Sequence, residues 1–172
     1  MVIPARWFAG GKGLDGGLDV EAVREAFAQV TSPGRLEVVR RSPTVVLDAA
    51  HNVDGAAACA DTLAEEFTLG GSLVIVAGLL RGRDPVEMLQ ALGATEAGFI
   101  VACSPDSPRA IPASELAAAA ESLGIVSESV STVEDAVERA LALSSPDDFV
   151  LVTGSLYVVG PARSFLQSEV DA

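Results

Sequence analysis

The stretch that decides the fold is TVVLDAAHNVDG, residues 44–55. It begins with a short apolar run rich in β-branched residues, which is typical of a strand buried on both faces. It then leads directly into a helix predicted over residues 53–66. A buried strand followed at once by a helix is the repeating unit of α/β domains.

This alternation continues along the chain. Strands are predicted over residues 36–40, 44–49, 73–77, 99–103, 125–130 and 149–153, and helices over residues 53–66, 85–92, 113–123, 133–143 and 158–166. Entry signals support the helices: Asp84 before Pro85, Pro112 or Ser114, and Ser131 or Thr132. The pattern predicts a Rossmann-like α/β domain whose mostly parallel sheet, of about six strands, is flanked by helices. The sequence has no GxGxxG motif after the first predicted strand.

The beginning of the chain has a different character. Residues 1–17 are rich in glycine and are predicted to be a linker or remnant, and residues 18–30 a short amphipathic helix ended by TSPG, residues 31–34. The fragment GGKG is not a phosphate loop, because Arg6 and Gly13 stand where that motif needs glycine and Ser or Thr. The domain is predicted to span residues 18–172.

Composition narrows the class of protein. With 172 residues, 49% of them hydrophobic and 20% charged, the chain can bury a core. It shows no membrane-spanning run and no secretory leader, so we expect a cytoplasmic protein with no membrane partner. Cys59 and Cys103 stand far apart and there is 1 histidine, which argues against a disulfide framework or a metal cluster. We expect both cysteines to be core residues.

The net charge of −13 disfavours a nucleic-acid partner. The cations are nevertheless uneven. A stretch of under about fifty residues holds Arg35, Arg40, Arg41, Arg81 and Arg83. If these arginines converge in space, they would form one site for a small phosphate or carboxylate. The alternative is that they are solvated surface residues.

Ligands of open α/β sheets bind beyond the carboxyl ends of the strands. The strand predicted over residues 44–49 is followed by His51, the single histidine, and by Asn52, which would cap the next helix. His51 would then lie at the positive end of that helix, where an anion is favoured. Alternatively, Asp48 caps the loop and His51 hydrogen-bonds to it.

Two further strand ends carry polar groups. After residues 149–153, Gly154 allows a tight turn and Ser155 offers a hydroxyl to a small ligand, unless it only forms the turn. A hydrolase triad of Asp48, His51 and Ser155 is disfavoured because GxSxG is absent. After residues 73–77, the loop AGLLRGRD delivers Arg81 and Arg83 to the same edge, unless it is a flexible basic loop.

Three motifs in order, SPGRLE at 32–37, VLDAAHNVDG at 46–55 and TGSLYVVG at 153–160, resemble the C-terminal domain of bacterial folylpolyglutamate synthase and dihydrofolate synthase, a branch of the Mur ligase superfamily. The resemblance covers roughly residues 18–166. It implies an ATP-dependent ligase that adds L-glutamate to a folate or dihydropteroate carboxylate through an acyl phosphate, assisted by Mg²⁺. It also implies a preceding ATPase domain with the phosphate loop, the metal ligands and the folate pocket, so this chain alone is expected to be inactive.

The resemblance also assigns roles to residues. It implies that Arg35 meets the nucleotide phosphates and that Asp48 holds the ATP ribose or positions its loop. His51 would face the phosphate or the incoming glutamate, and together with Asp48 is the implied catalytic residue. Asn52 would support the nucleotide side, whereas Ser155, Arg81 and Arg83 would bind substrate.

One departure from the family pattern is Val53, which stands where the family has proline after His-Asn. Proline at the first helical position is pre-organised but not required, so we expect a less rigid loop and an intact site. The alternative function is a free-standing nucleotide-binding, anion-binding or regulatory module without catalysis.

Overall fold

The computed structural model describes residues 33–67 and 70–170, and from residue 34 onward these belong to one compact unit, Gly34–Ala172. Its sheet has the strand order β1-β2-β6-β3-β4-β5. The strands are β1 (Glu37–Arg41), β2 (Thr44–Asp48), β3 (Leu73–Ala77), β4 (Phe99–Cys103), β5 (Ser127–Val130) and β6 (Phe149–Thr153). All neighbours pair in parallel except β1, which is antiparallel to β2. The linker and helix predicted over residues 1–30 lie outside the described residues.

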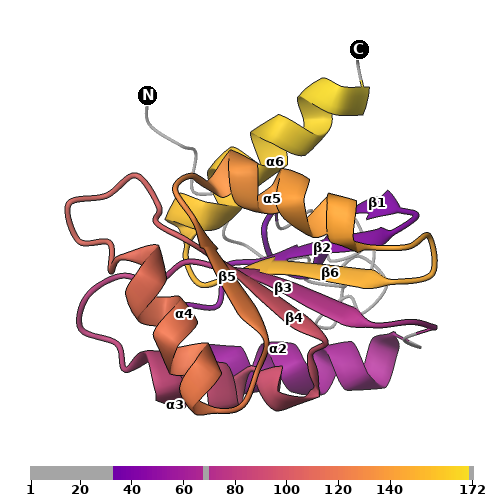
Figure 1. The fold of residues 1–172 in the computed structure, drawn as a ribbon. Coiled ribbons are helices and arrows are strands. Elements are labelled where there is room, and N and C mark those ends of the chain that lie inside the picture. The colour runs from indigo at the N-terminus through magenta and orange to yellow at the C-terminus, as the bar shows by residue number, and fades with distance from the viewer. Residues whose placement is uncertain (1–32, 68–69, 171–172) are drawn as a thin grey trace, which may run out of the picture. The chain divides into compact units, whose positions relative to one another are not determined.

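Helices cover both faces of this sheet (Figure 1). They are α2 (Val53–Glu66), α3 (Pro85–Ala91), α4 (Ala113–Ser122), α5 (Val133–Leu143) and α6 (Leu156–Val170), with a 3₁₀ turn, η2 (Ala94–Glu96). One face is covered by α5 and α6, and the other by α2, α3 and α4. None of the described helices is both long and apolar enough to cross a membrane.

The predicted Rossmann-like, mostly parallel architecture is confirmed, and the differences lie at element ends. The strand expected from residue 125 starts at Ser127, because the Ile125 N–H bonds back to the carbonyl of Ala120 and closes α4. The helix expected from residue 158 starts at Leu156, because the Ser155 carbonyl already accepts the N–H groups of its first turn. The turn η2 was not predicted.

Side chains at the helix starts agree with the sequence signals. The Asp84 carboxylate accepts the N–H groups of Val86 and Glu87 at 2.8 and 3.1 Å, with Pro85 in the first turn of α3. The Thr132 hydroxyl accepts the N–H of Asp135 at 3.1 Å and caps α5. Each cap satisfies N–H groups that the helix itself leaves unpaired.

The core explains why the strands are nearly continuous apolar runs. Along β2, Val45 and Leu47 pack beneath α5 and α6, whereas Val46 between them packs against the layer of α2, α3 and α4. Cys59 and Cys103 are free, buried thiols, one in each layer. The prediction that both are core residues is confirmed.

Because of these thiols, the stability of the fold depends on pH in the alkaline range. Burial is the main cause that raises the pKa of both Cys59 and Cys103 from 9.0 to about 12. The folded state therefore keeps protons that the unfolded chain releases, so stability is fully present below pH 9 and falls as the pH rises towards 12. We expect each thiol to lower the free energy of unfolding by about 2 kcal/mol between pH 8 and about pH 10.5.

Urea unfolding at the two pH values measures this loss. The double variant Cys59→Ala, Cys103→Ala serves as the control, because it removes both thiols and leaves every other side chain unchanged. A variant whose stability falls as steeply as that of the unmodified chain would contradict the prediction.

The carboxyl edge of the sheet is crowded where β3 and β6 end. Gly154 has a φ of +111°, and a Cβ placed on it would lie 2.4 Å from the carbonyl oxygen of Gly78. Only glycine fits there, because a side chain would meet rigid backbone and also strain its own. This close approach brings the ends of the two strands together.

We expect Gly154→Ala to destabilise the fold more than Gly82→Ala, as measured by urea unfolding. Gly82 has a φ of +90° but open space around its Cβ position, so its change incurs only the conformational cost, about 1–2 kcal/mol. The clash at Gly154 should add about 1–3 kcal/mol more. Equal losses for the two variants would show that the backbone contact is unimportant.

Candidate functional site

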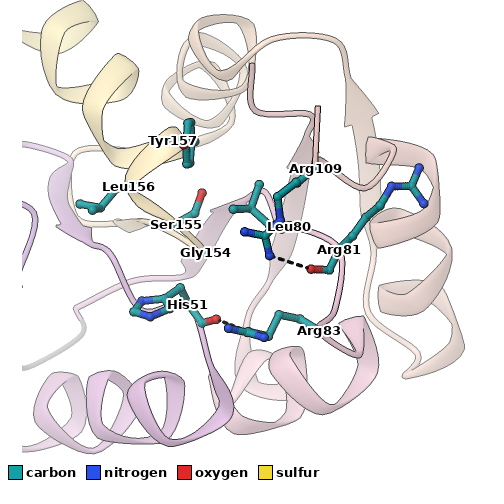
Figure 2. A pocket seen from close by; sticks show the side chains of 9 residues that line it. All are labelled: His51, Leu80, Arg81, Arg83, Arg109, Gly154, Ser155, Leu156 and Tyr157. Carbon is teal, nitrogen blue, oxygen red and sulfur yellow. Dashed lines mark hydrogen bonds between the residues drawn. The ribbon is translucent and has the colours of Figure 1, made fainter. Parts of the chain in front are cut away.

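Four loops at the carboxyl edge of the sheet surround a hollow of about 210 Å³ (Figure 2). They follow β2, β3, β4 and β6, which are neighbours in space although not in sequence. The residues lining this pocket are His51, Leu80, Arg81, Arg83, Arg109, Gly154, Ser155, Leu156 and Tyr157. Of the sequence-predicted site residues, His51, Arg81, Arg83 and Ser155 are therefore brought together.

Asp48 does not line the pocket, but its carboxylate holds two nearby segments in place, the turn before β1 and the loop after β2. Its carboxylate accepts the N–H of Leu36 at 3.0 Å and the N–H of Ala50 at 2.8 Å. The first bond fixes the turn that carries Arg35, and the second fixes the loop that carries His51. This is the loop-capping alternative for Asp48, and its negative charge also contributes to the raised pKa of Cys59.

His51 lies exposed at the pocket wall. Its Nδ1 is 3.1 Å from the carbonyl oxygen of Ala49, so the ring bonds to backbone and not to Asp48. Arg83 spans two loops, because its Nε donates to the His51 carbonyl at 2.7 Å and its Nη1 to the Gly82 carbonyl at 3.0 Å. The loop after β3 is thus tied to the loop after β2 by a guanidinium group.

Arg109 was missed by the sequence reasoning. The N–H of Arg81 donates to the carbonyl of Arg109 at 2.6 Å, and a bridge pairs Leu80 with Ala110, so the loops after β3 and β4 are joined. The signal was available, since Arg109 follows β4 as Arg81 follows β3, but the ends of only three other strands were considered. Arg109 completes a group of three arginines in this pocket.

The pocket is strongly positive. Its lining contains three arginines and His51 and no carboxylate, in a chain of net charge −13. Arginine offers forked N–H donors that match carboxylate and phosphate oxygens. Of the two alternatives for the arginines, convergence is only partly met: the loop of Arg81 and Arg83 borders the pocket, whereas Arg40 and Arg41 end β1 beside the first residues of β2, at the opposite edge of the sheet.

Ser155 stands at the beginning of α6 with its hydroxyl unsatisfied. The residue is 2% exposed, and its Oγ has no hydrogen-bond partner among the described residues. A buried polar atom without a partner is costly, and a ligand that enters the pocket would remove that cost. Since Oγ does not bond to His51, the disfavoured hydrolase triad is not assembled.

Arg35 and Asn52 lie outside the pocket lining. Asn52 accepts the N–H of Gly55 at 2.7 Å and caps α2, as the sequence predicts. Arg35 is exposed, on the turn before β1. Within residues 33–67 and 70–170, no three His, Cys, Asp or Glu side chains are placed to hold a metal ion.

We expect Asp48→Asn to lower the free energy of unfolding by about 1–3 kcal/mol, measured by urea unfolding. A carboxamide can accept one of the two N–H groups, but its NH₂ faces the other. The amide of Leu36 or Ala50 should therefore also exchange its hydrogen faster. Asp147→Asn, which neutralises an exposed carboxylate, is the control and should change stability by about 0.5 kcal/mol or less. Equal losses would argue against the two-loop tie.

Two relatives share this sequence over most of its length. The chain is 40% identical over 148 residues to a probable bifunctional folylpolyglutamate synthase/dihydropteroate synthase of Haloferax volcanii, covering 86% of this chain and 17% of the relative. It is 40% identical over 171 residues to a dihydrofolate synthase/folylpolyglutamate synthase of Mycobacterium tuberculosis, covering 90% of this chain and 34% of that protein. The chain thus spans about a third or less of these relatives.

A solved structure has the same fold. It is a bifunctional folylpolyglutamate synthase/dihydrofolate synthase with Mn, AMPPNP and L-glutamate bound, which matches with a TM-score of 0.78 and 27% identity over 89% of this chain and 36% of that one. The family model of the Mur ligase glutamate ligase domain matches residues 34–156, which contain all four loops around the pocket. The chain therefore belongs to the Mur ligase family, as its glutamate ligase domain.

Proposed function

We propose that this domain is the glutamate-binding part of an ATP-dependent ligase that joins L-glutamate to the carboxylate of a folate or dihydropteroate. The observation that carries the proposal is the pocket itself, whose lining includes Arg83, Arg109 and the buried hydroxyl of Ser155, which has no hydrogen-bond partner among the described residues (Figure 2). A solved relative of the same fold has L-glutamate bound. About two thirds or more of the length of the relatives lies outside the region that this chain matches, and we propose that this remainder supplies the folate pocket.

The pocket suits L-glutamate because this substrate carries two carboxylates. Arg109 would offer a forked pair of donors, and Ser155 a hydroxyl, to those oxygens. The Arg81 guanidinium points away from Ser155 in this structure, so Arg81 would have to reorient to bind the substrate (Figure 2). Leu156 and Tyr157, 70% and 53% exposed, would cover the methylene groups between them. Arg83, already bonded to the His51 carbonyl, would act mainly by holding that loop.

The proposed reaction needs the amino group of glutamate to be free and correctly aimed. ATP would first phosphorylate the acceptor carboxylate, releasing ADP. The amine nitrogen would then form the amide bond as the carbon–oxygen bond to phosphate breaks, so that phosphate leaves and the ammonium protons pass to solvent. Fixing both carboxylates of glutamate orients the amine, which is the contribution expected of a rigid binding site. His51, at the pocket wall, would face the phosphate or this amine.

We propose that the nucleotide lies on the Arg35 side of the site. Glu37 pairs with Leu47 in the register of β1 and β2, so the Arg35 turn lies at the same carboxyl edge as the pocket. Arg35 would meet the phosphates, and Asp48 and Asn52 would support that side by holding their loops. Mg²⁺ would neutralise phosphate charge when bound, and its ligands are proposed to lie in the remainder of the enzyme. We propose that the whole enzyme works in the cytoplasm.

The test is L-glutamate binding and ligation by a chimera in which residues 34–170 replace the matching region of the M. tuberculosis relative. We expect glutamate-dependent release of ADP with a folate or dihydropteroate present. Arg109→Gln should raise KM for glutamate by about 10- to 100-fold, because a charge-assisted bond to a carboxylate is lost. Calorimetry with L-glutamate on this chain should show the same loss of affinity.

Arg41→Gln is the matched control, since it removes the same charge at the opposite edge of the sheet and should leave KM within about twofold. Equal effects of the two variants would contradict a specific pocket and indicate general electrostatic attraction. Binding of glutamate by the chain without turnover in the chimera would favour the alternative, an anion-binding module without catalysis.

A further inference from the structure

The turn that carries Arg35 has an unusual backbone. Gly34 and Leu36 both have positive φ, of 72° and 46°. Leu36 is not a glycine, so its conformation is costly and persists only where surrounding contacts impose it. These contacts show what fixes Arg35 in place.

Three hydrogen bonds hold the turn. The Asp48 carboxylate accepts the N–H of Leu36 at 3.0 Å, and the Gly34 carbonyl accepts the N–H of Ala49 at 2.7 Å. On its other side, the Gly34 N–H donates to Oε2 of Glu37 at 2.8 Å. Of these three bonds among the described residues, two come from the end of β2 and the residue that follows it, and the third depends on where the Glu37 carboxylate is held.

Arg163, on α6, holds that carboxylate. Its Nε lies 3.0 Å from Oε1 and 3.2 Å from Oε2 of Glu37, and its Nη1 donates to Gln167 on the same helix at 3.3 Å. The Glu37 side chain is 22% exposed and that of Arg163 is 36% exposed. The Arg163 guanidinium is therefore fixed to α6. It holds the Glu37 carboxylate in place, and this carboxylate in turn accepts the N–H of Gly34.

The turn also packs directly on α6. A Cβ placed on Gly34 would lie 2.6 Å from Cγ1 of Val159, so the backbone of the turn touches the first turn of this helix. The same helix begins next to Ser155 and contributes Leu156 and Tyr157 to the pocket. One rigid element thus borders both the Arg35 turn and the pocket.

We infer that Glu37 and Arg163 are positioning residues that lock the Arg35 turn to α6, and so fix Arg35 relative to the pocket. The placement of Arg35 for nucleotide phosphates rests on the proposed function, whereas the locking of the turn does not. Neither residue lines the pocket. The competing explanation is that the ion pair between Glu37 and Arg163 only stabilises the fold. Exposed ion pairs contribute little to the free energy of unfolding.

The domain offers a matched control in a second ion pair. Arg139 on α5 bonds to Glu128 on β5 through Nε at 2.9 Å, with side chains 43% and 33% exposed. It has the same chemistry and a similar exposure but makes no bond to the Arg35 turn. A substitution of Arg139 therefore measures how much stability is lost with an ion pair that does not contact the Arg35 turn.

The experiment compares Arg163→Gln, the charge swap Glu37→Arg with Arg163→Glu, and Arg139→Gln. Hydrogen exchange of the Gly34 and Leu36 amides is measured by NMR on this chain, together with the urea midpoint. We expect Arg163→Gln to speed Gly34 exchange by at least about tenfold, while its urea midpoint matches that of Arg139→Gln. The swap should restore the midpoint but not Gly34 protection, because arginine cannot accept a hydrogen bond.

Unchanged Gly34 exchange in Arg163→Gln, or an equal acceleration in Arg139→Gln, would overturn the inference. In the ligase chimera, Arg163→Gln should raise KM for ATP by about fivefold or more and leave KM for glutamate within about twofold. An unchanged KM for ATP despite a loosened turn would overturn the functional part. A chimera inactive even without these changes would instead count against the proposed function, and the exchange data would then decide the positioning inference alone.

Discussion

Two backbone N–H groups, those of Leu36 and Ala50, meet on the carboxylate of Asp48, and the arrangement of the site depends on this contact. A carboxylate is suited to this task because it can accept from several directions and its bonds are stronger than those of a neutral acceptor. It stands at the end of β2, which is buried and paired on both sides. The irregular Arg35 turn and the His51 loop therefore take their positions from a strand that is held on both sides.

The distribution of charge separates two kinds of anionic partner. Over distances beyond about 10 Å, salt screens individual charges, and the excess of carboxylates repels an extended polyanion. Within the pocket, Arg83 and Arg109 are the charged neighbours of an entering group. The acidic net charge of the chain is therefore compatible with the proposed binding of a small carboxylate at this place.

Much of the fold could be predicted because its signals are local. The bounds of β3, β4, β6, α2 and α5 agree with the apolar runs and helical spacing of the sequence, and Asp84, Thr132 and Asn52 cap the helices they were expected to cap. Errors arose where a backbone bond to a neighbouring element moved a boundary, as at Ile125. The grouping of His51 with Ser155 could be predicted from the rule for strand ends, but Arg109 was overlooked in a long loop.

The sequence by itself determined the family motifs, the alternation of strands and helices, and the residue types at the strand ends, because each is written in a few consecutive residues. The tertiary structure decided which of these ends meet. Strand β6 lies between β2 and β3, and this order places Ser155 beside both His51 and Arg81. The antiparallel β1 sends Arg40 and Arg41 to the far edge and keeps Arg35 at the near one. Strand order and direction arise from long-range packing, so no local spacing could reveal them.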